Sequence, residues 1–227
     1  MAETVVILFA TLLLLLGTIQ FGLIYNAKIT LNYATFEAAR AGALNYADHQ
    51  AIQYGLARGL APLYTSVETN TPMLGSGGTI GRVQLARKKV FAEAKDGEFV
   101  CIERINPNSE AFSAYGEPDL VSDFPQNGEM IPNDKLLYRS AIAGGGGVSI
   151  QDANLLKIRV TYCYPMYIPF IATTIKKLYK FKGGYLETAG GFQENCLEKD
   201  RMPIVAQAVI RMQTPAWDDP SFPNSCD

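Results

Sequence analysis

Residues 4–25 read TVVILFATLLLLLGTIQFGLIY, an apolar run that contains no charged side chain. About 20 apolar residues are enough for a helix to cross the hydrocarbon core of a bilayer. The run therefore predicts an N-terminal helix whose first part, residues 1–25, lies in a membrane or in an equally apolar core of packed helices. A cleavable signal peptide is not indicated, because no Lys or Arg precedes the run and the first cation is Lys28.

Glu3 stands just ahead of this run. A carboxylate at the edge of hydrocarbon is costly unless it is paired. One interpretation is that Glu3 complements the positive end of the helix dipole. The interpretation that we favour is that Glu3 neutralises the N-terminal amine, on Met1, of a neighbouring copy when such helices pack together.

The helical pattern continues past Tyr25, and no proline interrupts it before Pro62. Small and apolar side chains recur every three or four residues and share one stripe: Ile24, Ala27, Leu31, Ala34, Ala38 and Ala41, with Gly42 at its edge. We expect residues 1–64 to form one long helix, of which residues 3–60 would span roughly 85 Å. The small-residue face of its amphipathic second half suits close helix packing.

The rest of the chain, residues 65–227, predicts a β-rich head domain. A loop-like linker (65–78) leads into a short amphipathic helix over residues 79–95. Strands are predicted over 98–105, 154–164 and 204–213. Residues 136–143 are expected to form either a strand or no regular element, and residues 169–179 either a short helix or an apolar surface segment. The simplest assembly is α+β: an antiparallel sheet packed on the C-terminal half of the long helix.

Four cysteines, Cys101, Cys163, Cys196 and Cys226, form no CxxC motif. With one histidine in the chain, a zinc site is not indicated. An even number of cysteines behind a membrane segment predicts two disulfides in an oxidising compartment. Of the three possible pairings we favour Cys101–Cys163 with Cys196–Cys226.

No arrangement of residues predicts catalysis or a cofactor site, so we expect a protein that is not an enzyme. His49, the single histidine, is expected to pack or to face solvent, and the acids Asp218 and Asp219 are expected to lie in a solvated turn. The chain has 227 residues and a formal net charge of −2, so a nucleic-acid partner is not indicated either.

The N-terminal half of this pattern resembles type IV pilins, and most closely the TadE-like proteins of the tight-adherence pilus family. The resembling features are Glu3, the apolar run, Tyr25 near its end and the small-residue stretch Ala38–Ala43. The resemblance is specific over residues 1–44. The later segments LLKIRVTYCYPMYIPF and PIVAQAVIRMQTP are also similar to downstream strands of the family, more loosely.

The resemblance implies cleavage by a prepilin peptidase, extraction from the inner membrane by a pilus assembly machinery, and stacking of the N-terminal helices into a homopolymeric filament. In the family the glutamate is the fifth residue after the cleavage point, whereas here it is the third residue. Either the mature chain begins earlier, or this member differs. Gly17 and Gly22 are expected either to permit local unwinding and close approach in the filament or to be ordinary membrane-helix glycines.

Three functions follow as hypotheses. The first is a structural subunit of an extracellular filament at the bacterial cell surface, used in surface attachment. The second is a minor, tip or assembly component of such a filament. The third, from a different class, is a periplasmic binding domain anchored by a single membrane span.

Overall fold

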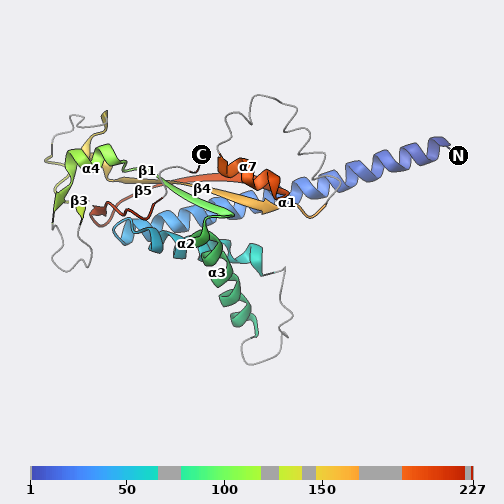
Figure 1. Cartoon of the computed structure of the whole chain (residues 1–227), viewed down its shortest axis with the longest axis horizontal. Helices are drawn as coiled ribbons and strands as arrows, with labels where there is room; N and C mark the ends of the chain where they lie inside the picture. The colour runs from blue at the N-terminus through green and yellow to red at the C-terminus, as the bar shows by residue number, and fades with distance from the viewer. Residues whose placement is uncertain are drawn as a thin grey trace.

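The computed structural model describes residues 2–65, 78–118, 128–139, 147–168, 191–222 and 226 (Figure 1). It combines a long N-terminal helix with antiparallel sheets, which confirms the α+β class expected from the sequence. The described elements are α1 (Ala2–Leu44), α2 (His49–Tyr64), α3 (Gly78–Asp96), β1 (Val100–Asn106), α4 (Ser109–Tyr115), β2 (Glu117–Pro118), β3 (Glu129–Ile131), α5 (Ile150–Ala153), β4 (Leu155–Pro165), α7 (Gly191–Glu198), β5 (Arg201–Arg211) and β6 (Ala216–Trp217).

The main sheet has three antiparallel strands in the order β1-β4-β5. The central strand β4 alternates, as its sequence predicts, and buries Leu156, Ile158 and Val160 completely. These side chains face the second half of α1, which packs against both β4 and β5. A second small sheet, β2-β3-β6, lies at the end of the molecule farthest from the N-terminus (Figure 1).

The strands predicted at 98–105, 154–164 and 204–213 correspond to β1, β4 and β5, and the helix predicted at 79–95 corresponds to α3. For the segment 136–143 a strand or no regular element was expected. Its described residues 136–139 form a turn and a bend, so the strand alternative is wrong for them. The segment 169–179 lies outside the described residues. The helices α4, α5 and α7 were not predicted.

The expected continuous helix over residues 1–64 is wrong, because α1 ends at Leu44 and α2 begins at His49. Tyr46 and Ala47 adopt left-handed backbone angles, with φ of 56° and 59°. Asp48 then caps α2 by accepting a hydrogen bond from Ala51 N at 2.8 Å. No glycine or proline marks this turn.

Tertiary contacts hold the turn between α1 and α2 in place. Gln213 N donates to Ala43 O at 2.9 Å, and Trp217 N donates to Tyr46 O at 2.8 Å. The hydroxyl of Thr214 accepts from Tyr46 N, also at 2.9 Å. Residues far along the chain therefore stabilise a backbone that is unfavourable locally, and this explains why local sequence patterns missed it.

The predicted small-residue stripe of α1 packs closely against α2, as well as against the sheet. A Cβ atom added to Gly59 would overlap Ala34 Cα, and one added to Gly55 would lie 2.9 Å from Ala38 Cα. The two pairs run in opposite directions along the chain, so the helices form an antiparallel hairpin. Helix backbones approach this closely only where both surfaces carry Gly or Ala.

All four cysteines form disulfides, but the favoured pairing is wrong. The structure joins Cys101 to Cys226 and Cys163 to Cys196, with Cα–Cα distances of 5.9 and 5.3 Å. In the ladder Cys101 lies opposite Thr161, which makes Cys163 its diagonal neighbour on the adjacent strand. Diagonal neighbours are about 7–8 Å apart, beyond the usual reach of a disulfide.

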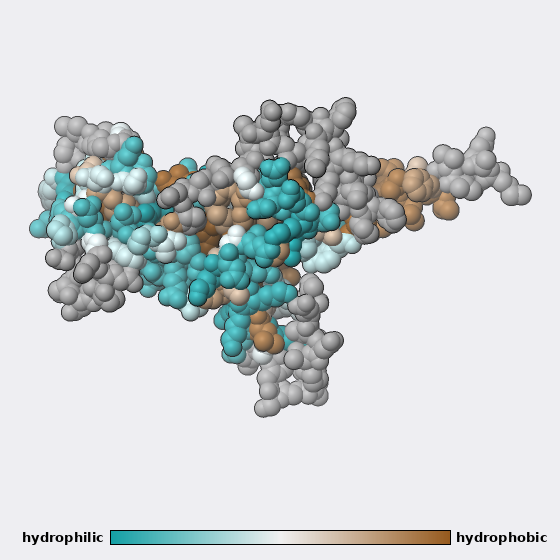
Figure 2. Space-filling view, viewed as in Figure 1, coloured by the Kyte–Doolittle hydropathy of each residue, from teal (hydrophilic) through white to brown (hydrophobic). Residues whose placement is uncertain are grey.

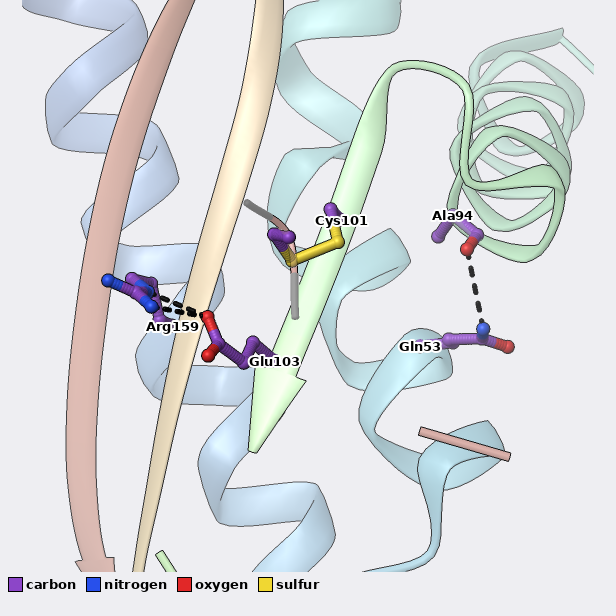
Figure 3. Close-up of a disulfide and its surroundings, with 6 residues drawn as sticks. Gln53, Ala94, Cys101, Glu103 and Arg159 are labelled. Atoms are coloured by element: carbon purple, nitrogen blue, oxygen red, sulfur yellow. Dashed lines mark hydrogen bonds and ion pairs between the residues drawn. A yellow bond between two sulfur atoms is a disulfide. The ribbon is translucent and has the colours of Figure 1, made fainter. Parts of the chain in front are cut away.

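Both disulfides lie on the sheet face that is turned away from α1. Cys163–Cys196 ties α7 to β4, and Cys101–Cys226 ties the C-terminal tail to β1. Arg159 and Glu103 form an ion pair at 2.6 Å on the same face (Figure 3). The sheet is thus covered by α1 and its partner helices on one side and by cross-linked segments on the other.

Candidate membrane and assembly segment

The first half of α1 projects away from the rest of the molecule (Figure 1). Figure 2 shows brown, hydrophobic atoms along this projection, in contrast to the largely teal surface of the head. Its large apolar side chains are exposed by about half or more: Ile7 63%, Leu8 68%, Phe9 63%, Leu12 53%, Leu14 72%, Leu15 59%, Ile19 49%, Phe21 66% and Tyr25 68%. Exposed apolar surface of this extent marks a membrane or protein interaction site.

Among the described residues, one helix is long and apolar enough to span a membrane. Its most apolar 18-residue window has a mean hydropathy of 2.3 and is 6% buried within the chain. A core helix of a soluble domain would be mostly buried, so this helix needs an apolar partner from outside its own chain.

The exposed apolar surface does not end with the membrane-length run. Beyond it, Ile29, Tyr33, Phe36 and Leu44 are 50%, 59%, 50% and 53% exposed. With Tyr25 they recur at spacings of three, four or eight residues and so share one face of α1, which we call the outer stripe. The opposite face of the helix is the buried small-residue stripe described above.

Gln20 is the one amide within the apolar run, and it faces the head. Its side chain is fully buried, and its Oε1 accepts a hydrogen bond from Ile168 N at 3.3 Å. The described part of the head therefore reaches α1 at this level, and residues 2–19 project beyond that part. At about 1.5 Å per residue, this projection measures roughly 27 Å, close to the ~30 Å of a bilayer core.

The sequence-predicted assembly residues all lie on this segment. Glu3 belongs to α1, but its side chain lies outside the described part of the chain, as does Met1. A Cβ added to Gly17 or Gly22 would meet no atom within 4 Å. Packing within one subunit therefore does not require glycine at either position, and the assembly roles of all four residues remain predictions.

Of the two C-terminal acids, Asp219 differs from expectation because it is buried, whereas the side chain of Asp218 is 43% exposed. Asp219 is 5% exposed and accepts hydrogen bonds from His49 N at 2.7 Å and Ser221 N at 2.8 Å. Asp218 forms an ion pair with Arg104 at 2.6 Å. These contacts fasten the tail to the start of α2 and to β1.

His49 packs in the head: it is 8% exposed and lies edge-on to Phe222, with ring centroids 4.4 Å apart. Burial lowers the pKa of its imidazole, and this effect outweighs the nearby carboxylates of Asp219 and Asp48. In the described part of the chain, no three His, Cys, Asp or Glu side chains are grouped so as to hold a metal ion.

The N-terminal apolar helix is the part of the chain that matches a known protein family. Residues 1–40 match the family of TadE-like proteins. The match is consistent with a TadE-like protein of the tight-adherence (Tad) pilus, and it covers the projecting half of α1 and most of the half that packs on the sheet. Searches of curated proteins and of solved structures gave no match.

The TadE-like match and the apolar helix together suggest a membrane-associated, Tad pilus-associated protein. The TadE-like family is not a family of enzymes. The outer stripe was missed by sequence analysis, although its signal was present: Ile29, Tyr33 and Phe36 recur at helical spacing on the face opposite the alanines.

Proposed function

We propose that this chain is a structural subunit of an extracellular Tad-like pilus filament used in surface attachment. Before assembly, residues 1–25 lie in the inner membrane, where lipid covers their apolar side chains. After processing by a prepilin peptidase, the pilus assembly machinery moves the subunit into a homopolymer. There the α1 helices of neighbouring copies cover one another, and the heads face outward.

The observation that carries this proposal is the outer stripe. Lipid can cover about 20 residues of a helix, but the apolar face of α1 continues for a further 19 residues, or roughly 28 Å, past Tyr25. In a lone membrane-anchored protein, Tyr33, Phe36 and Leu44 would face water. Parallel packing of neighbouring α1 helices covers both the membrane-length run and the stripe.

The energetics of such packing are favourable. Each CH₂ group removed from water contributes about 0.8 kcal/mol, so covering a 20-residue apolar helix can offset the cost of ordering the subunits. Head-to-tail contacts of this kind do not close on themselves, and they produce an open helical polymer. Within it, Glu3 would pair with the N-terminal amine of a neighbouring Met1, and Gly17 and Gly22 would allow close approach.

A second candidate is a single-pass, membrane-anchored periplasmic domain or a minor, tip or assembly component. The contact between Gln20 and Ile168 favours the anchored domain. The projection beyond Gln20, roughly 27 Å long, suits one crossing of a bilayer without any polymer. The amount of this protein in the sheared filaments and in the membrane fraction distinguishes these roles. A major subunit forms most of the protein sheared from cells, a minor component is present in traces or at one end, and an anchored domain stays in the membrane fraction.

The experiment is to express Phe36→Asp and Ile29→Asp variants in the native host and to measure sheared filaments by electron microscopy and immunoblotting. Both positions are 50% exposed, so the subunit should fold and reach the membrane normally while filament yield falls strongly. The matched control is Leu85→Asp, at an equally exposed position on α3. Normal filaments from both stripe variants would refute the proposed packing.

Glu3→Ala tests the charge pairing separately. If the carboxylate neutralises a neighbouring amine, this variant should accumulate in the membrane and form few or no filaments. If it complements only its own helix dipole, filaments should form at nearly normal yield, because that interaction contributes about 0.3–1 kcal/mol.

A further inference from the structure

A cavity of about 620 Å³ lies in the head, between α2, the end of α3, β1 and the C-terminal tail. This volume falls within the range of small-molecule binding sites, about 300–1,000 Å³. Figure 3 shows part of its surroundings, with Gln53 of α2 pointing toward Ala94 of α3 and the Cys101 disulfide on the neighbouring strand. None of its described lining residues belongs to α1.

A buried polar side chain of α2 lines the cavity with a poorly used hydrogen-bonding group. Gln53 is 7% exposed, and its amide nitrogen makes a long hydrogen bond of 3.4 Å to Ala94 O. A buried polar atom without a good partner costs about 1–3 kcal/mol, so a ligand that bonds to the Gln53 amide gains free energy.

The charges around the cavity select against an ionic ligand. The positive N-terminal end of α2 is already balanced, because Asp48 and Asp219 accept hydrogen bonds from its first backbone N–H groups. The described lining contains no carboxylate, and its one cation, Lys95, is exposed. The imidazole of His49 favours its neutral form, since burial lowers its pKa.

Aromatic rings form the apolar part of the wall: Phe91, Phe192 and Phe222. Phe91 is fixed by stacking on Tyr54, with ring centroids 4.3 Å apart and planes within 8°. Phe222 is held edge-on against His49. A fully apolar ligand would cover these rings but leave the Gln53 amide with only its long hydrogen bond to Ala94 O, which disfavours it.

We propose that this cavity binds one ring of a carbohydrate. A sugar ring is uncharged, carries hydroxyl groups that both donate and accept hydrogen bonds, and has an apolar C–H face that packs on aromatic rings. The Gln50 and Gln53 amides bond the hydroxyl groups, and Phe192 and Phe222 receive the apolar face. This property belongs to a single head and does not depend on filament formation.

The test uses the full chain in phospholipid nanodiscs, since maltoside or glucoside detergents would compete for the site. Saturation-transfer NMR and titration calorimetry are performed with the methyl glycosides of glucose, galactose, mannose and N-acetylglucosamine. We expect saturation transfer to the ring protons of at least one of them. Gln53→Ala and Phe192→Ala should each weaken its binding by about tenfold, as expected for the loss of one hydrogen bond or ring contact.

The matched control is Gln207→Ala, which removes an exposed amide on β5 outside the cavity and should leave binding unchanged. Gln50→Ala changes an exposed lining residue and keeps the test valid if Gln53→Ala destabilises the head. Thermal unfolding reports folding for every variant.

Three results would overturn the proposal. The first is the absence of saturation transfer from all four glycosides. The second is binding that the cavity variants and Gln207→Ala affect equally. The third is binding of N-acetyl-phenylalaninamide in the same cavity without any glycoside, which would assign the cavity to a protein side chain instead.

Discussion

The two halves of α1 belong to one continuous helix but have opposite surroundings. In the first half, large side chains such as Leu8 and Leu14 are 68% and 72% exposed, whereas in the second half Ala27, Leu31 and Ala34 are fully buried. In the second half, small residues occupy the face that packs against α2, and large residues remain on the outer stripe. Small residues let α2 approach closely, while large ones provide apolar area for a partner outside the chain.

This difference separates the folding stability of the head from the membrane association of the chain. The second half of α1 contributes to the folding of the head, because its small residues belong to the same core as β4 and β5. In the first half, no described residue before Ile24 belongs to or packs on that hydrophobic core, and Gln20 alone is fully buried against the head. We propose that the projecting residues instead set the membrane association of the molecule. A substitution on the buried face of the second half should therefore change head stability, and a substitution in the projecting residues should change membrane association.

The largest expected effect is on membrane insertion. Leu14→Arg places a cation in the middle of the apolar run and should disfavour insertion by about 2.5–3.5 kcal/mol. Melting of the head should be unchanged, because Leu14 is 72% exposed. Membrane fractionation and thermal unfolding measure the two properties. Leu137→Arg, at an 89% exposed position of the head, is the control and should stay in the membrane fraction.

A lower melting temperature for Leu14→Arg than for Leu137→Arg would contradict the independence of the two halves. Unchanged membrane association of Leu14→Arg would show instead that the projecting half is not the membrane-bound part of the chain.

A pair of glycine substitutions compares the two halves directly. Gly59→Ala places a methyl group against Ala34 Cα and should destabilise the head by about 1–3 kcal/mol through overpacking. Gly22→Ala meets open space within the subunit and should leave the head as stable or slightly more stable, since Ala favours a helix by about 1 kcal/mol over Gly. Chemical denaturation of both variants measures the difference.

The same pair sharpens the filament proposal. If neighbouring helices approach closely at Gly22, Gly22→Ala should reduce filament yield although the head is intact. Equal loss of head stability in both variants would show that the halves of α1 are not packed as described.

The regular elements of this fold could be predicted from local pattern. The alternation in 154–164 identified the central strand, and the small-residue stripe from Ala27 to Ala38 identified the buried face of α1. The turn after Leu44 could not be predicted in this way, because it lacks glycine and proline and depends on contacts with Thr214 and Trp217. The disulfide pairing depended on strand register and on the position of α7, which the cysteine spacing does not reveal.

The sequence predicted which residues form the candidate membrane and assembly segment, but not which parts of the chain pack around it. Hydropathy alone identified residues 4–25 as the apolar part. The outer stripe required knowledge of which face of α1 the head covers, and that follows only from the packing of β4, β5 and α2. The buried state of Asp219 also depends on tertiary structure, since its partner, His49, lies 170 residues away in the chain.

The smallest effect that we expect is a pH dependence confined to the head. Residues 4–24 contain no ionisable side chain, so mild acidification should not alter the projecting half of α1. Burial lowers the pKa of His49 in the folded head, although Asp219 and Asp48 oppose this shift and Arg104 adds to it. The unfolded chain then binds a proton on His49 more readily than the folded head does. The contribution of neutral His49 to the free energy of unfolding is therefore present above about pH 6.5 and is lost as the pH falls.

Thermal unfolding at pH 7.5 and pH 5.5 checks this prediction, because Asp and Glu remain mostly ionised over this interval. The wild-type head should melt at a lower temperature at pH 5.5. His49→Gln cannot titrate, so its melting temperature should vary less with pH, whatever its absolute stability. Equal pH slopes for the two proteins would exclude His49 as the cause, and a head that becomes more stable on acidification would mean that the carboxylates of Asp48 and Asp219 outweigh burial.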